Sequence, residues 1–163
     1  MKKKTLVILI ACAVLGCAAL SVALTTRSAG SGTYDNLIIN GAFEETEAEG
    51  LPAGWYADAY IATTGYTTYG TDEGFVGGAA HIVNHALNDS RFAQRVKVSP
   101  NTLYHLRGFI KADAAGGRGA NLSVEGVAVY SETMYSTDGN WIEVSLYGRT
   151  GANQTEATVY ARL

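Results

Sequence analysis

The stretch SRFAQRVKVSPNTLYHLRGFIKADA, residues 90–114, decides the fold class of the chain. On both sides of a Ser-Pro-Asn-Thr turn at residues 99–102, apolar residues alternate with polar or charged ones. Successive side chains of a strand point to opposite faces, so a period of two predicts strands with one buried face and one face in water. The stretch therefore predicts two amphipathic strands joined by a turn. Their apolar members include Phe92, Val96, Val98, Tyr104, Leu106 and Ile110.

The same period of two recurs towards the C-terminal end of the chain. It is visible at residues 121–125, 141–147 and 156–162, which are separated by segments rich in glycine and asparagine. Short amphipathic strands at this spacing indicate an antiparallel sandwich or barrel. The sequence therefore predicts an all-β fold, which we interpret as a jelly-roll β-sandwich covering residues 34–163.

The N-terminal segment has a different composition. Three lysines, Lys2 to Lys4, precede an uncharged and largely apolar run over residues 5–26. Such a run is long enough to span a bilayer as a helix, and the lysines favour the cytoplasmic side. We expect a hydrophobic helix in residues 1–26, a short polar linker over 27–33, and a domain held outside the cell membrane by this anchor.

Two other fates of this segment stay open. A cleaved signal peptide ending near residues 21–23 would release the domain as a secreted protein. The sequence Val-Leu-Gly-Cys at residues 14–17 is similar to a bacterial lipobox, in which Cys17 would carry the lipid. Because Cys12 and Cys17 are the two cysteines of the sequence, the exported part is expected to contain no disulfide and no thiolate metal site.

Charge and motif content argue against several function classes. The formal net charge is −3, which does not predict a nucleic-acid-binding surface. His81 lies in a strand-like run, AAHIV, which would separate it from His85 by roughly 13 Å and does not suit zinc. No motif pairs Glu125 with Glu143 as the two carboxylates of a glycoside hydrolase would be paired, so catalysis is the weakest of three hypotheses. We expect a non-catalytic protein.

Aromatic and planar polar side chains share the outward faces of the predicted strands. Small-ligand sites combine apolar contact area with a few placed polar groups, and flat rings stack on the apolar faces of sugars. Aromatic residues also suit strands for packing reasons alone. Trp55, which follows a turn and opens a strand, is either a core residue or a further ligand contact. The other expected contacts are Phe109, Tyr147 and Tyr160 as stacking platforms, with Arg107, Asn121 and Glu125 as hydrogen-bonding partners.

Three stretches carry a resemblance to a known family: NLIINGAFEE with LPAGW at residues 36–55, the stretch 90–114, and GNWIEVSLYGRTGANQTEATVYARL at residues 139–163. Together they resemble the carbohydrate-binding modules attached to xylanases and cellulases, which have a galactose-binding-like jelly-roll fold. The resemblance covers Asn36 to Leu163. It implies a domain that binds a polysaccharide or glycan without cleaving it.

A narrower resemblance gives a second hypothesis. The segments LPAGWYADAY (51–60), GANLSVEG (119–126) and residues 146–163 are similar to the extracytoplasmic part of bacterial membrane glycosyltransferases of the protein mannosyltransferase type. This implies a structural or protein-interaction module of a larger membrane enzyme.

The family resemblance also implies a metal. Modules of this type often hold a structural calcium between the Glu of an opening Asn-Gly-x-Phe-Glu motif and an acid of a final acidic strand. Glu44 has the motif position, whereas the sequence reaches Leu163 without that strand. The resemblance therefore implies a partial calcium site at Glu44, no other required cofactor, and an apparently missing last strand.

Overall fold

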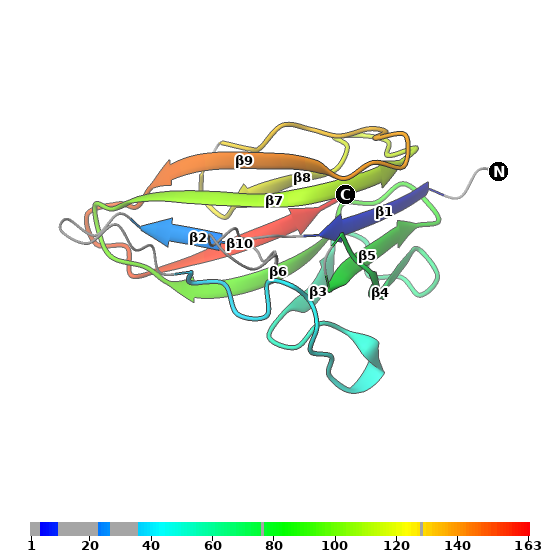
Figure 1. Cartoon of the computed structure of the whole chain (residues 1–163), viewed down its shortest axis with the longest axis horizontal. Coiled ribbons are helices and arrows are strands. Elements are labelled where there is room, and N and C mark those ends of the chain that lie inside the picture. Colours follow the sequence, from blue (N-terminus) through cyan, green and yellow to red (C-terminus); the bar gives the residue numbers. More distant parts are fainter. Residues whose placement is uncertain (1–3, 10–22, 27–35, 76, 128) are drawn as a thin grey trace.

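The computed structural model describes residues 4–9, 23–26, 36–75, 77–127 and 129–163 (Figure 1). Over these ranges the chain forms strands and one short 3-10 turn, Ala48–Gly50, with no α-helix. The all-β prediction is thus confirmed. The strands are β1 (Lys4–Leu9), β2 (Ala23–Thr26), β3 (Tyr56–Ala59), β4 (Thr67–Glu73), β5 (Gly78–Asn84), β6 (Ser90–Lys97), β7 (Leu103–Asp113), β8 (Asn121–Val124), β9 (Ile142–Arg149) and β10 (Glu156–Arg162).

The described strands pair antiparallel in two sheets. The wide sheet has the order β9-β7-β1-β5-β4, and β2 continues along the same edge of β7 as β1, opposite Tyr104–Arg107. The narrow sheet has the order β3-β6-β10-β8. In Figure 1 the long strands β9 and β7 of the wide sheet run in roughly the same direction as β10 and β6 of the narrow sheet.

Strand β7 shows why the alternating pattern produces this arrangement. Tyr104, Leu106, Ile110 and Ala112 are buried, whereas the residues between them lie on the outer face of the wide sheet. The period of two seen in the sequence is therefore the division between core and surface. The outward residues are His105, Arg107, Phe109 and Lys111.

The turn between β6 and β7 carries the chain from the narrow sheet to the wide one. Asn101 adopts a left-handed backbone conformation with φ of 52°, which asparagine tolerates better than most residues. The hydroxyl of Tyr104 accepts a hydrogen bond from the Ser99 amide at 2.7 Å, and Thr150 Oγ1 donates to the Ser99 carbonyl at 2.6 Å. These contacts fix the crossing, so the two strands predicted from one stretch lie in different sheets.

A large apolar cluster of described residues fills the space between the sheets. Phe92 of β6 is completely buried and meets Tyr69 of β4 edge-on, with ring centroids 5.3 Å apart. Burial of such side chains from both layers supplies the main driving force for folding. Other members that are almost fully buried are Ile82, Ile110, Leu122, Val144 and Val159.

The apolar residues 37–39 do not lie in a strand. Ile39 is held instead by Gln94 of β6, whose side-chain oxygen accepts from the Ile39 amide and whose side-chain nitrogen donates to the Ile39 carbonyl. For the expected hydrophobic helix, the structure describes only residues 4–9 and 23–26, which are extended in β1 and β2. The remainder of that segment and the linker 27–33 lie outside the described residues. Within the described ranges, no helix is long and apolar enough to cross a membrane.

Candidate ligand-binding faces

The outer face of the wide sheet gathers aromatic rings from β7 and β9. The register places His105 opposite Tyr147, Arg107 opposite Ser145, and Phe109 opposite Glu143. Tyr147 is 59% exposed and stacks on the imidazole of His105, with centroids 4.1 Å apart and planes inclined by 6°. Cross-strand neighbours on one face are close enough for such contacts, so the stack follows directly from the register.

A second stack lies further along β7. Phe75, from the segment between β4 and β5, covers Phe109 with centroids 5.3 Å apart and planes inclined by 18°. Trp141 joins Phe109 and the buried Ala79 in a small apolar cluster on this face, and the Lys111 ammonium lies 5.0 Å from the centre of the Trp141 ring. His105 and Phe109 are four residues apart, which is roughly 13 Å along a strand. The two stacks therefore form separate platforms on one surface.

An ion pair lies between the two stacks. Arg107 Nη1 is 3.4 Å from Glu143 Oε1, and both side chains are partly exposed. A guanidinium and a carboxylate together offer several donors and acceptors in fixed planes. The arrangement can hold a flat ligand by its apolar faces and its polar edge groups at the same time.

Two histidines of this face are shielded from water. Burial lowers the pKa of His105, and the nearby Arg107 charge lowers it further. Burial also lowers the pKa of His81 on β5, while Asp72 acts in the opposite direction. Both imidazoles are consequently neutral at pH 7, so this face does not gain positive charge from them.

The expected ligand contacts Tyr160 and Glu125 lie on the other side of the molecule. They belong to the outer face of the narrow sheet, where Glu125 Oε2 accepts a hydrogen bond from Thr158 at 2.6 Å. The Arg91 guanidinium lies 5.2 Å from the centre of the Tyr160 ring. Because the core separates the two outer faces, the expected residues do not form one site. Phe109, Tyr147 and Arg107 come together; Tyr160 and Glu125 form a second group.

Two other expected contacts are buried. Trp55 is 5% exposed, packs against Phe43 with ring centroids 5.3 Å apart, and donates its indole N–H to the Ile39 carbonyl at 3.2 Å. Asn121 is 2% exposed and donates to the Gly119 carbonyl at 3.3 Å. Trp55 therefore belongs to the core and offers no ring face to a ligand, and Asn121 lies beneath the surface of the narrow sheet.

Glu44 lies exposed beside the start of β5. A Cβ atom added to Gly77 would be 2.8 Å from Glu44 Oε1, so the carboxylate lies close against the backbone there. Over the described ranges, no three His, Cys, Asp or Glu side chains are close enough together to hold a metal ion. Calcium can also take main-chain oxygens, and the partial site at Glu44 stays a prediction.

Several residues of the wide-sheet face were not expected as contacts. In the sequence, His105 is only a polar position of an alternating strand. Its contact with Tyr147 follows from the pairing register of β7 and β9. Phe75 is in a connecting segment without any period, so no local pattern could place its ring over Phe109.

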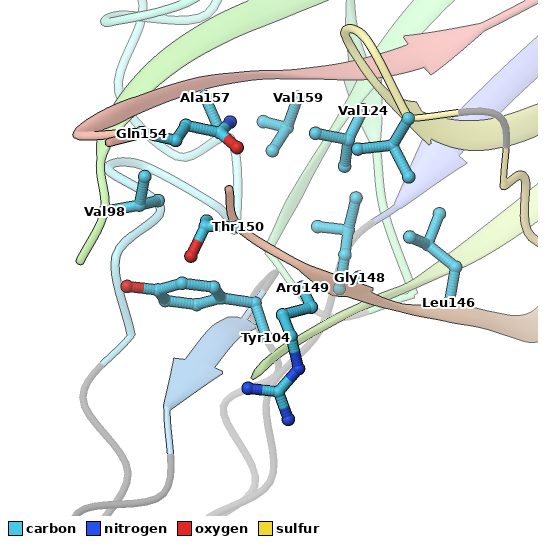
Figure 2. Close-up of a pocket in the computed structure, with 12 residues that line it drawn as sticks. Val98, Tyr104, Val124, Leu146, Gly148, Arg149, Thr150, Gln154, Ala157 and Val159 are labelled. Atoms are coloured by element: carbon cyan, nitrogen blue, oxygen red, sulfur yellow. The ribbon is translucent and has the colours of Figure 1, made fainter. Parts of the chain in front are cut away.

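A cavity lies between the two sheets near the ends of β7 and β9. Figure 2 shows side chains of both layers around it, including Val124, Val159 and Leu146, with Tyr104, Thr150 and Gln154 towards its other end. Its volume is about 30 Å³. Pockets for small organic ligands are roughly ten times larger. This space is a packing gap and not a ligand site.

Comparisons with known proteins add no assignment. No family model matches the chain, and no curated protein is significantly similar to it. What the structure supports directly is a β-rich fold of two facing antiparallel sheets, whose outer faces both carry aromatic and charged side chains.

Proposed function

We propose that the chain is a non-catalytic carbohydrate-binding protein, and that the outer face of the wide sheet holds the polysaccharide or glycan. One observation carries this proposal: two aromatic stacks, Tyr147 on His105 and Phe75 on Phe109, flank the Arg107–Glu143 ion pair on one surface. Rings give apolar contact area to the faces of sugar units, and the ion pair gives hydrogen bonds to their hydroxyl groups.

The positions of the carboxylates support a binding role over a hydrolytic one. A glycoside hydrolase needs two carboxyl groups on either side of one glycosidic bond, roughly 5 to 10 Å apart. Glu143 lies on the outer face of the wide sheet in contact with Arg107, whereas Glu125 lies on the outer face of the narrow sheet. The two candidates cannot face each other across a single substrate.

The finer assignments are part of the same proposal. The galactose-binding-like jelly roll is the version of the two-sheet fold that the sequence resemblance implies, with a structural calcium at Glu44. A membrane anchor formed by residues 5–26 is a separate part of the proposal. The residues that pair in β1 cannot at the same time span a bilayer. Membrane fractionation of the full chain, before and after an alkaline wash, tests whether the segment is inserted.

Calorimetry or affinity electrophoresis of the full chain against soluble neutral polysaccharides tests the binding function. An aromatic contact contributes about 0.5–1.5 kcal/mol, so Tyr147→Ala and Phe75→Ala should each weaken binding by about two- to tenfold. Tyr60→Ala is the matched control, because Tyr60 is 84% exposed and lies in the segment after β3, not on this face. Failure of the folded protein to bind any glycan would refute the proposal.

The alternative is a structural or protein-interaction module of a larger membrane glycosyltransferase. The same wide-sheet face favours it, because exposed aromatic and arginine side chains are also typical of protein interfaces. This alternative predicts that Tyr147→Ala leaves glycan binding absent or unchanged and instead weakens association with a partner domain.

A further inference from the structure

The outer face of the narrow sheet contains a hollow of about 370 Å³. Three residues from neighbouring segments lie side by side across it: Tyr160 of β10, Ser123 of β8, and Tyr130 of the segment that returns along β8. Adjacent strands are roughly 4.8 Å apart, so the two tyrosines stand roughly 10 Å apart with the small serine between them. The result is a slot with an aromatic wall on each side and a serine floor.

The floor of this slot contains a polar atom without a hydrogen-bond partner over the described ranges. Ser123 is 2% exposed, and its hydroxyl has no hydrogen-bond partner over the described ranges. Asn121, two residues earlier on the same face of β8, is also 2% exposed, and its side-chain oxygen has no partner over those ranges either. Buried polar groups are nearly always satisfied in folded proteins. Asn121 does not line the hollow, whereas Ser123 does, so the unsatisfied Ser123 hydroxyl indicates a polar ligand group that completes it.

The walls of the slot are held by an internal charge network. The guanidinium of Arg91 lies 5.2 Å from the centre of the Tyr160 ring, and that of Arg162 lies 5.9 Å from the centre of the Tyr130 ring. Both arginines pair with Asp89, and Arg91 also pairs with Asp58 at 2.5 Å. Because these cations are already neutralised, the slot offers no unpaired arginine to an anion and favours a neutral ligand.

The slot continues into a more polar surface. Glu125 lines both the slot and an adjoining hollow of about 320 Å³ whose other residues include Arg95, Gln154 and Glu156. Burial raises the pKa of Tyr160, and the nearby Glu125 charge raises it further, so the phenol remains a hydrogen-bond donor at neutral pH. An elongated ligand could place one ring between the tyrosines and its hydroxyl groups along the polar part.

We infer that this hollow is a second ligand site, which takes one neutral sugar ring between Tyr130 and Tyr160 with a hydroxyl or amide group directed to Ser123. The inference takes its ligand class from the proposed function, but it uses different residues on the opposite side of the molecule. A chain with binding sites on two opposite faces can link two polysaccharide strands. It would then cross-link polysaccharide strands and not only bind the protein to one of them.

The test uses linear hexasaccharides of glucose, xylose and mannose as probes, titrated calorimetrically into the full chain. We expect two hexasaccharides per chain. In a Tyr147→Ala/Phe75→Ala background, Tyr130→Ala and Tyr160→Ala should each weaken the remaining binding at least threefold, whereas Tyr60→Ala should not. The melting temperature of each variant shows that it is folded.

Ser123→Ala separates a binding role from a structural one. Because the hydroxyl has no partner in the described part of the fold, its removal should leave the free energy of unfolding unchanged or increase it, while the affinity for the hexasaccharide falls. A variant that loses stability and keeps its affinity would overturn the assignment of Ser123 to a ligand.

The outcomes also separate this inference from the proposed function. One hexasaccharide per chain, lost in the Tyr147→Ala/Phe75→Ala variant and insensitive to Tyr130 and Tyr160, would overturn the second site and leave the proposed function standing. Binding that depends on the two tyrosines of the slot alone would establish the second site and refute the wide-sheet proposal. No binding of any probe would overturn both.

Discussion

The side chain of Gln94, which we call the clamp because it binds both ends of one loop, gives the most direct test of how this fold is stabilised. Gln94 of β6 is 3% exposed. Its side-chain oxygen accepts the Ile39 amide at 2.8 Å, and its side-chain nitrogen donates to the carbonyls of Ile39 at 2.9 Å and Gly54 at 3.0 Å. One side chain therefore fixes both ends of the loop that encloses the acidic residues 44–49.

The effect of Gln94→Leu can be worked out from these contacts. The substitution keeps the approximate volume but removes three hydrogen bonds, each worth about 1 kcal/mol net. The Ile39 carbonyl still accepts from Trp55, whereas the Ile39 amide loses its bond to Gln94 and pays part of its desolvation cost. We expect a loss of about 3 kcal/mol in the free energy of unfolding, or about 10 °C in melting temperature.

Urea unfolding followed by tryptophan fluorescence measures this loss, since Trp55 lies against the clamped loop. Arg95→Leu is the matched control, because Arg95 is the next residue of β6 and is exposed, so its replacement should change stability by less than about 0.5 kcal/mol. A Gln94→Leu protein as stable as the control would show that the reasoning about the clamp is wrong.

Gln94→Glu adds a signature that simple loss of packing does not give. The new carboxylate would face two carbonyl oxygens, so its pKa in the folded state should rise above about 4.3, the value in the unfolded chain. The folded state then binds the proton more tightly, and the variant should regain stability as pH falls through the raised pKa. A variant that only loses stability on acidification would contradict this reading.

Two further predictions concern the wide sheet. Burial lowers the pKa of His81 and His105 below the ordinary 6.5, so the folded protein resists their protonation. This contribution to the free energy of unfolding should be fully present above pH 6.5. It should be lost as the pH falls from 6.5 through the lowered pKa values of the folded state. Unfolding at pH 7.5 and 5.5 should show a smaller difference in His81→Gln and His105→Gln than in the parent. Gly78→Ala would place a Cβ atom 2.3 Å from the Phe43 carbonyl oxygen and should lower the free energy of unfolding by about 1–3 kcal/mol. A Cβ atom at Gly70 in β4 would meet nothing within 4 Å, so Gly70→Ala should be neutral or slightly stabilising. Equal melting temperatures for the two glycine variants would refute the contact.

The sequence predicts those strands whose two sides face different environments. β6 and β7 alternate because one side faces the core and the other faces water, so both are visible in residues 90–114. Strand β4, TTYGTDE, lies at the edge of the wide sheet and is only partly buried along its length. Its residues give no regular alternation, and nothing in its local sequence predicted a strand.

The candidate site was harder to predict for a different physical reason. Alternation tells which side chains point out of the core, but a two-layer fold has two outer faces, and the period is the same on both. Tyr147 and Tyr160 are equivalent in pattern, yet one lies on the wide sheet beside His105 and the other on the narrow sheet beside Ser123. Which strands become neighbours is decided by long-range pairing, which a local period cannot report.

The same geometry limits what any ligand can do on this protein. A ligand on one outer face is separated from the other face by both sheets and the core between them, a spacing set by the roughly 10 Å distance between packed sheets. A single sugar unit therefore cannot touch Tyr147 and Tyr160 together, and binding at the two faces must be additive unless one polymer wraps around the edge. Double-mutant analysis of Tyr147→Ala with Tyr160→Ala should accordingly give a coupling energy within about 0.5 kcal/mol of zero for short oligosaccharides. A large coupling would mean that the ligand bridges the faces, and the two-site account would have to be replaced by one continuous site around the sheet edge.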